Sequence, residues 1–291
     1  MRLNRRNFLA LSALAGAYPL FSEAAETDHG VFWRAQSARY QLTIFGYARV
    51  RAADVPDMVR DGKGLIDRTQ SLLVDMSPDI KLANADFDRR ALSPILPALP
   101  EPARTQLRSL LPPSAGQSLI DKLSGFEVSL FLEGEGAQPV TAATPTVGLE
   151  LVNYGVSLRR PVTTLLSEKD VLGFAHVLSL DTVKSVGPQA ILYLLDLRRR
   201  VGPIGAYLQN LYRSRQTGEL DKVSREIKAH THFSLSDLVD AERLKALLVE
   251  RIGMLPAGTS AFLTVPIGII TGPASILDAL QAQGAEVSLI G

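Results

Sequence analysis

Histidine is the residue type in this chain best suited to metal or acid–base chemistry, and the chain has four histidines and no cysteine. The lack of cysteine excludes disulfides, thiolate metal sites, iron–sulfur clusters and cysteine nucleophiles. His230 and His232 are the one close pair, and two imidazoles could share a metal ion if they projected from a strand. The surrounding pattern places them in a turn between helices, which favours two solvated side chains. His29 and His176 have no neighbour at ligand spacing, so we expect surface or core positions for them.

Other motifs offer little catalytic chemistry. The sequence contains no His-Glu-x-x-His zinc motif and no Gly-x-Ser-x-Gly nucleophile turn. Residues 134–136 (Gly-Glu-Gly) and 202–205 (Gly-Pro-Ile-Gly) are predicted turns, because neither opens a helix after a strand as a dinucleotide site would. The run Arg198-Arg199-Arg200 ends a predicted helix, where positive charge suits the helix dipole. We interpret this run as a solvated face, with a contact to an anion or an acidic lipid as the alternative.

The composition is that of an ordinary globular protein. Of the 291 residues, 46% are hydrophobic and 21% are charged, which argues against a disordered chain and against a coiled coil. The 31 basic and 30 acidic residues give a net charge of +1, and no basic patch or nucleic-acid module is evident. We therefore expect no nucleic-acid partner. The length suits one large domain or two small ones.

The N-terminus has the pattern of an export signal. Arg5-Arg6, one spacer and then Phe8-Leu9 come close to the twin-arginine motif. The apolar run that follows is too short for a bilayer span, which takes about 20 residues. Ser22-Glu23-Ala24 offers a small-x-small cleavage site. A basic amphipathic helix is the alternative interpretation.

The sequence thus predicts a twin-arginine-type signal peptide over residues 1–24 and a mature domain over residues 25–291. Removing the signal leaves 28 basic and 29 acidic residues, a net charge of −1. No other stretch approaches 18 uninterrupted apolar residues. We therefore expect a periplasmic or otherwise exported protein that contacts the membrane only through its signal peptide before cleavage.

Short apolar or alternating segments rich in β-branched and aromatic residues predict the strands of the mature domain. These predicted strands are Tyr40–Tyr47, Ser71–Met76, Phe126–Leu132, Val162–Leu166, Ala261–Val265 and Glu286–Ile290.

Segments with helical spacing of apolar residues lie between the strands. The predicted helical regions are part of Asp54–Thr69, two or three short helices within 86–124, Thr146–Leu158, almost all of Lys169–Gly253, and Pro273–Gln283. Within the long region we expect turns near Gly202-Pro203, near Gly218 and near His230–His232, and Ser234 and Ser236 as N-caps. Strands at both ends of the chain predict an α/β fold, a mixed sheet built from both halves with a large helical insertion, and a single domain.

The order of several segments resembles that of the TraB/GumN family. The C-terminal quarter, from the helix at Glu242-Arg243 through Leu255–Thr259 and AFLTVPIGIITGPASILDALQAQGAEVSLIG, is similar to the ending of that family. Phe32-Trp33-Arg34 followed by YQLTIFGYARV resembles its opening. Residues 71–75 (SLLVD) and 146–150 (TVGLE), the latter followed by Arg160-Pro161-Val162, resemble its middle blocks. The resemblance covers residues 31–291 by order and spacing more than by identity, and it implies a TraB/GumN-like domain.

This chain departs from the family where the resemblance implies metal ligands. The family's proposed metal centre draws on two Gly-x-x-His turns and nearby carboxylates. The first turn reads Gly46-Tyr47-Ala48-Arg49 here, and an arginine cannot bind a cation because it has no acceptor atom. The second turn reads Pro266-Ile267-Gly268-Ile269, without the histidine.

The nearby carboxylates are also reduced. A family glutamate position falls at Leu166, and the asparagine expected after Arg243 is Leu244. Asp75, in place of a glutamate, and Arg243 keep family-like chemistry. A catalytic zinc needs about three protein ligands, so the resemblance implies a dismantled hydrolase site.

We therefore take Arg49, Asp75, Glu150 and Arg243 as residues of a vestigial pocket, and we expect no catalytic residue, no metal and no cofactor. Arg49 would stand at the vacated metal position facing Asp75, or else be a simple surface arginine. The predicted function is a non-catalytic binding or accessory protein of the cell envelope, with a small anionic ligand, an acidic peptide or an envelope protein as partner. The alternative is a metal-dependent, peptidase-like hydrolase with a rearranged site using Asp75, Glu150 or the pair of His230 and His232.

Overall fold

The structure is a computed structural model, and it describes residues 30–76, 92–110, 121–139, 144–167, 169–170, 184–231, 241–271 and 275–290. The predicted signal peptide, three of the histidines (His29, His176 and His232), the predicted N-caps Ser234 and Ser236, and Pro273 lie outside the described residues.

One six-stranded sheet forms the base of the molecule, with the strand order β4-β3-β5-β2-β1-β6. The strands are β1 (Phe32–Gln36), β2 (Tyr40–Tyr47), β3 (Ser71–Met76), β4 (Val162–Leu166), β5 (Thr259–Pro266) and β6 (Glu286–Leu289). Strands β2, β5, β3 and β4 are parallel, whereas β1 pairs antiparallel with both β2 and β6. The pairing of β2 with β5 along their whole lengths confirms that both halves of the chain build one sheet.

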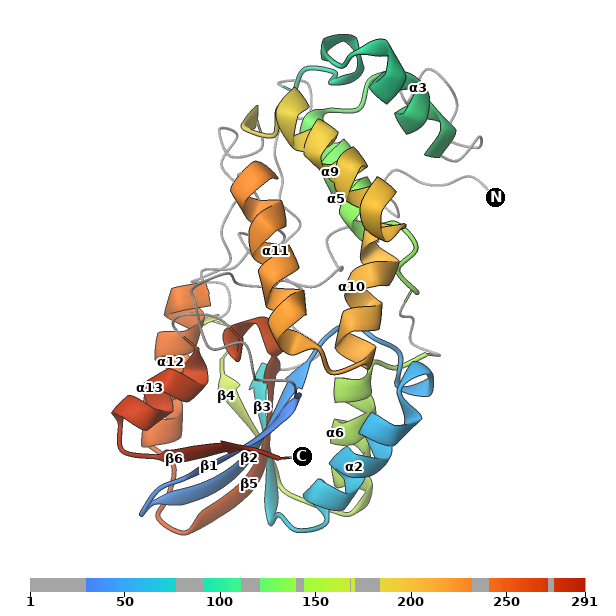
Figure 1. The fold of residues 1–291 in the computed structure, drawn as a ribbon. Coiled ribbons are helices and arrows are strands. Elements are labelled where there is room, and N and C mark those ends of the chain that lie inside the picture. The colour runs from blue at the N-terminus through green and yellow to red at the C-terminus, as the bar shows by residue number, and fades with distance from the viewer. Residues whose placement is uncertain are drawn as a thin grey trace.

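Helices cover both faces of this sheet (Figure 1). On one face lie α2 (Pro56–Ile66) and α6 (Val147–Ser157), and on the other lie α12 (Ala241–Gly253) and α13 (Ile276–Ala282). The α6 helix approaches the sheet closely at Gly155, where a Cβ atom would lie 2.4 Å from Leu72 Cδ1. A side chain at this position would push the helix off the sheet, so the glycine permits the contact. Thr146 begins α6 by accepting a hydrogen bond from Leu149 N.

A group of helices rises from the end of the sheet where the parallel strands finish (Figure 1). Its members are α3 (Glu101–Leu110), α5 (Gly125–Gly134), α9 (Pro188–Val201), α10 (Ile204–Arg213) and α11 (Thr217–Thr231). Short 3-10 turns are η1 (Ala52–Asp54), η3 (Leu96–Ala98) and η6 (Ile267–Ile269). The described part of the chain thus confirms a mixed α/β fold with a large helical region. None of the described helices is long and apolar enough to cross a membrane.

One predicted strand is wrong: residues 126–132 belong to helix α5. Ser124 and Glu127 form a capping box, in which Ser124 Oγ accepts from Glu127 N and Ser124 N donates to Glu127 Oε2 at 3.0 Å. The apolar run FEVSLFL is buried nearly all round among other helices. A helix buried on every side loses the amphipathic pattern, and its sequence then looks like that of a buried strand.

The turn expected near Gly218 is found at residues 214–216, and Gly218 itself lies inside the first turn of α11. A smaller expectation fails in the same region. His230 and Thr231 lie in the last turn of α11 and not in a loop. Strand β1 was not predicted, because Phe32-Trp33-Arg34 was interpreted only as a block that resembles the opening of the TraB/GumN family. The strands predicted at 40–47, 71–76 and 162–166 are confirmed with the same bounds.

Candidate functional site

Arg49, Ile269 and Asp75 lie at one edge of the sheet, where β2, β5 and β3 end. These strands are neighbours, and Arg49 follows β2, Ile269 lies in η6 after β5, and Asp75 is near the end of β3. Ligands of open α/β proteins usually bind outside the carboxyl ends of parallel strands. This edge, which we call the carboxyl edge, is therefore the candidate site.

Asp75 is buried and bonded to a tyrosine. Its exposed fraction is 3%, and Asp75 Oδ2 accepts a hydrogen bond of 2.7 Å from the Tyr47 hydroxyl. Burial, and then the charge of Asp75 and its hydrogen bond, raise the pKa of Tyr47 well above its ordinary value. The phenol therefore stays protonated and serves as the donor to the carboxylate.

Arg49 does not pair with Asp75. Its guanidinium is half-buried, and among the described residues no carboxylate forms an ion pair with it. Burial lowers the pKa of Arg49 from its ordinary value to about 10, so the side chain is still charged at neutral pH. Its backbone is fixed, because Gln209 of α10 donates from Nε2 to Arg49 O at 3.0 Å. A half-buried guanidinium without a carboxylate partner can bind an anion from solution through charge-assisted hydrogen bonds.

Two further arginines, one close to Arg49 in the chain and one on the helix that binds its backbone, share a single carboxylate. Arg51 donates to both oxygens of Asp54, at 2.8 and 2.7 Å, and Arg213 of α10 donates to Asp54 Oδ2 at 3.1 Å. These pairs lower the pKa of Asp54, mainly through the hydrogen bond from Arg51. Arg51 and Arg213 with Asp54 thus form a group of two cations and one anion, two residues along the chain from Arg49, and we call these three residues together with Arg49 the arginine cluster.

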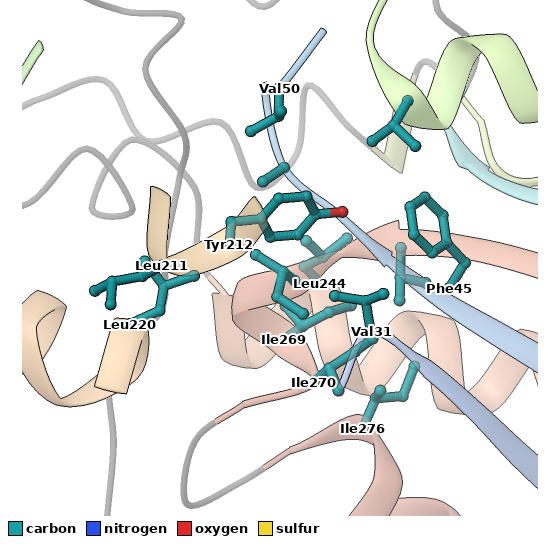
Figure 2. Packing of buried hydrophobic residues seen from close by; sticks show 14 of the residues in the cluster. Val31, Phe45, Val50, Leu211, Tyr212, Leu220, Leu244, Ile269, Ile270 and Ile276 are labelled. Atoms are coloured by element: carbon teal, nitrogen blue, oxygen red, sulfur yellow. The ribbon is translucent and has the colours of Figure 1, made fainter. Parts of the chain in front are cut away.

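The floor of the carboxyl edge is apolar. A Cβ atom at Gly46 would lie 2.5 Å from Ile267 Cδ1 and 2.7 Å from Ile270 Cδ1, so η6 packs directly against the end of β2. Tyr212 of α10 is fully buried, and its hydroxyl donates to Gly46 O at 2.8 Å. Figure 2 shows Tyr212 among Val50, Leu244, Ile269 and Ile270. Both turns at which the resemblance expects imidazoles are thus packed with aliphatic and aromatic groups.

The Glu150 side chain is engaged with a lysine and not with Asp75 or Arg49, and Arg243 is exposed. Glu150 lies in the first turn of α6 and accepts from Lys63 Nζ of α2 at 2.9 Å, on a helix layer that covers one face of the sheet. Arg243 is an exposed residue of α12 on the opposite layer. Its neighbour Leu244 is the residue that packs near Ile269 (Figure 2).

His230 is engaged within the helical region. Its ring stacks on Tyr193, with centroids 3.8 Å apart, and its Nδ1 lies 2.8 Å from Glu226 O. Within the described parts of the chain, no group of three or more histidines and carboxylates is arranged to hold a metal ion.

The basic run at the end of α9 is held by ion pairs. Arg198 Nε donates to Glu135 Oε2 at 2.6 Å in a partly buried pair, which corrects the expectation of a wholly solvated face. Arg199 and Arg200 both pair with Asp196 and are mostly exposed, as expected for that face.

Sequence reasoning missed Arg213, Gln209 and Tyr212, which α10 contributes to this edge. They lie about 160 residues from β2, and no motif marks them. The helical spacing of apolar residues in α10 is a signal that this helix packs on the core, but it does not mark these polar side chains.

Comparison of the chain with protein-family models, with curated proteins and with solved structures gives no match.

Proposed function

We propose that this protein is an exported, TraB/GumN-like binding or accessory protein of the cell envelope, without catalytic activity, and that the arginine cluster takes an anionic small molecule or an acidic peptide. The observation that carries the proposal is the half-buried Arg49, which has no carboxylate partner among the described residues and follows by three residues the glycine on which Ile267 and Ile270 pack. A buried positive charge costs stability, and an anionic ligand would offset that cost.

The groups that a rearranged hydrolase site would use are engaged elsewhere. Asp75 accepts from Tyr47, Glu150 pairs with Lys63, and His230 stacks on Tyr193. Each of these side chains thus has a partner of its own, and none of these contacts joins one of them to another. The packing therefore favours binding over metal-dependent hydrolysis.

Metal content tests the absence of catalysis. We expect the purified protein to hold no stoichiometric zinc, manganese or cobalt by elemental analysis, and to show no chelator-sensitive peptidase activity. One equivalent of any of these metals, together with hydrolysis that a chelator abolishes, would establish the hydrolase instead.

Anion binding at the arginine cluster can be tested with citrate and a pentaaspartate peptide as probes. We expect each probe to raise the melting temperature of the wild-type protein and to have a much smaller effect on Arg49→Met. The matched control is Arg34→Met, because Arg34 is an exposed arginine of β1. Equal stabilisation of wild type and Arg49→Met by both probes would exclude Arg49 as the binding group.

The export signal gives an independent test of location. We expect the wild-type precursor to be processed and recovered outside the cytoplasm, and Arg5→Lys/Arg6→Lys to remain unprocessed, because the twin-arginine motif depends on that pair. Unchanged processing of the double variant would contradict the twin-arginine assignment.

A further inference from the structure

The strands β2, β3, β4, β5 and β6 all begin at the edge of the sheet opposite the carboxyl edge. Five connections lead into these strands, and we call them together the amino edge: residues 37–39, 67–70, 158–161, 254–258 and 283–285. All five connections lie within the part of the chain that the structure describes. The surface of the amino edge is therefore known in full.

The connections of the amino edge lie side by side. Gly258 N donates to Arg39 O at 2.8 Å, which joins the connections before β5 and β2. Arg160 donates from Nη2 to Asp67 O at 3.1 Å, which joins those before β4 and β3. Neighbouring strands are about 5 Å apart, so the beginnings of β4, β3, β5 and β2 form one surface about 15 Å across.

Four arginines on this surface have no carboxylate partner. Arg39, Arg68 and Arg159 are exposed, and Arg160 is half-buried. Arg39 donates to the backbone carbonyl of Leu255, and Arg160 donates to the carbonyl described above. None of the four forms an ion pair with a described residue. Their charges are therefore available to an anionic surface from outside.

Acidic groups are few at the amino edge. The five connections contain one carboxylate, that of Asp67, which accepts a hydrogen bond of 2.8 Å from the Tyr154 hydroxyl. Glu286 opens β6, which is two strands away from β2. The surface over β4, β3, β5 and β2 thus carries a net positive charge, whereas the whole chain has a net charge of only +1.

Exposed apolar side chains gather on the same surface. Five large hydrophobic residues of the described chain are exposed, and four of them lie in these connections or directly beside them: Val156, Leu158, Val162 and Met254. Met254 is 60% exposed and precedes β5, and Leu158 is 41% exposed and directly precedes two of the arginines. Single exposed apolar residues are common on proteins, but a group of them at one place marks an interaction site.

The combination of unpaired arginines and exposed apolar residues suits a membrane surface. Arginines bind lipid phosphates through charge-assisted hydrogen bonds, and apolar side chains become buried at the level of the headgroups. A nucleic acid would use the arginines but leave Leu158 and Met254 in water. An apolar protein surface would cover those two residues but leave the arginines without partners. An anionic bilayer satisfies both kinds of side chain.

We propose that the amino edge binds the surface of a bilayer that contains anionic lipids, with its four arginines on the phosphates and Leu158 and Met254 inserted among the headgroups. Strand β2 has eight residues, so the amino edge lies about 25 Å from the carboxyl edge. The arginine cluster then faces away from the bilayer. The two sites share no residue, so either proposal can fail without the other.

Co-sedimentation with vesicles tests the role of the arginines. We expect the full-length wild type to bind vesicles made of equal parts phosphatidylcholine and phosphatidylglycerol, to bind pure phosphatidylcholine much more weakly, and to lose this preference at high salt. Each arginine near an anionic surface contributes about fivefold in affinity, so Arg68→Gln/Arg159→Gln should bind the mixed vesicles about 25-fold more weakly. Residues 1–24 are the same in all variants, so this difference reports the amino edge.

Arg60→Gln/Arg108→Gln is the matched control. It removes the same charge from two exposed arginines on α2 and α3, outside the amino edge. We expect it to bind the mixed vesicles nearly as well as the wild type. A wild type that binds both kinds of vesicle equally or binds neither, or an equal loss in the two double variants, would overturn the proposal.

A fluorescent label tests the insertion of apolar residues without removing any charge. The chain has no cysteine, so Leu158→Cys can carry a single environment-sensitive fluorophore. We expect its emission to rise and shift to the blue when mixed vesicles are added. The same label on Ser109→Cys should not respond, because Ser109 is an exposed residue of α3 at the other end of the molecule (Figure 1). If the label at residue 158 does not respond, or both labels respond equally, the amino edge does not bind the membrane.

Discussion

Replacing Arg49 by methionine should make the protein more stable. Methionine keeps an apolar stem of similar length and removes the charge. Burial lowers the pKa of Arg49 to about 10, which means that the folded state disfavours the charged form. The folded pKa lies below the unfolded one, so the full penalty is present at neutral pH and is relieved only as the pH rises through about 10.

The size of the gain follows from the same drop in pKa. At about 1.4 kcal/mol per pKa unit the drop corresponds to about 3 kcal/mol. The guanidinium is only half-buried, and solvent screening reduces the effect, so we expect a gain of about 1–2 kcal/mol. For a domain of this size each kcal/mol raises the melting temperature by about 2–4 °C.

Urea unfolding followed by circular dichroism at pH 7 measures this gain. The slope of the unfolding free energy against urea concentration should be the same in both proteins, which shows that the folded state is unchanged. Arg213→Met is the matched control, because Arg213 is similarly buried but pairs with Asp54 at 3.1 Å. We expect the control to lose stability. If Arg49→Met also loses stability, then Arg49 has a stabilising partner in the folded protein, and the proposed anion binding by Arg49 is wrong.

Two further variants test the packing at Tyr212 and the burial of an acid in α11. Tyr212→Phe removes the hydroxyl that donates to Gly46 O and should cost about 1–2 kcal/mol in urea unfolding; Tyr207→Phe, on the same helix, should cost much less, and equal costs would contradict the assigned hydrogen bond. Burial raises the pKa of Asp221 to about 6 against the opposing effect of Arg225, so the wild-type protein should lose stability as the pH rises from about 4 to about 6. Asp221→Asn should remove that loss and be more stable than wild type by about 2 kcal/mol at pH 8; identical pH profiles for both proteins would refute it.

Much of the sheet could be predicted from local sequence. The segments YQLTIFGY, SLLVDM and VTTLL become strands with the predicted bounds. Each is short and either apolar or rich in β-branched and aromatic residues, so local preference and tertiary burial agree. The helix from Val147 to Ser157 was predictable for the same reason, with Thr146 as its cap.

The candidate site could be predicted only in part. Chain order placed Arg49, Asp75 and Ile269 after strands, and parallel strands bring such positions to one edge. The hydrogen-bond partner of each side chain could not be predicted. Tyr47 donates to Asp75, Lys63 donates to Glu150 from 87 residues away, and Arg213 donates to Asp54 from 159 residues away. Such contacts depend on how helices lie against one another, and no periodicity in the sequence encodes them.

The sequence by itself determined the alternation of strands and helices and the union of both chain halves in one sheet, since these depend on residue type and local spacing. Tertiary structure alone decided that the run from Phe126 to Leu132 is a helix, because surrounding helices bury it on every side. It also decided that Asp75 accepts from a tyrosine while Arg49 pairs with no described carboxylate, because α10 and η6 close over the end of β2.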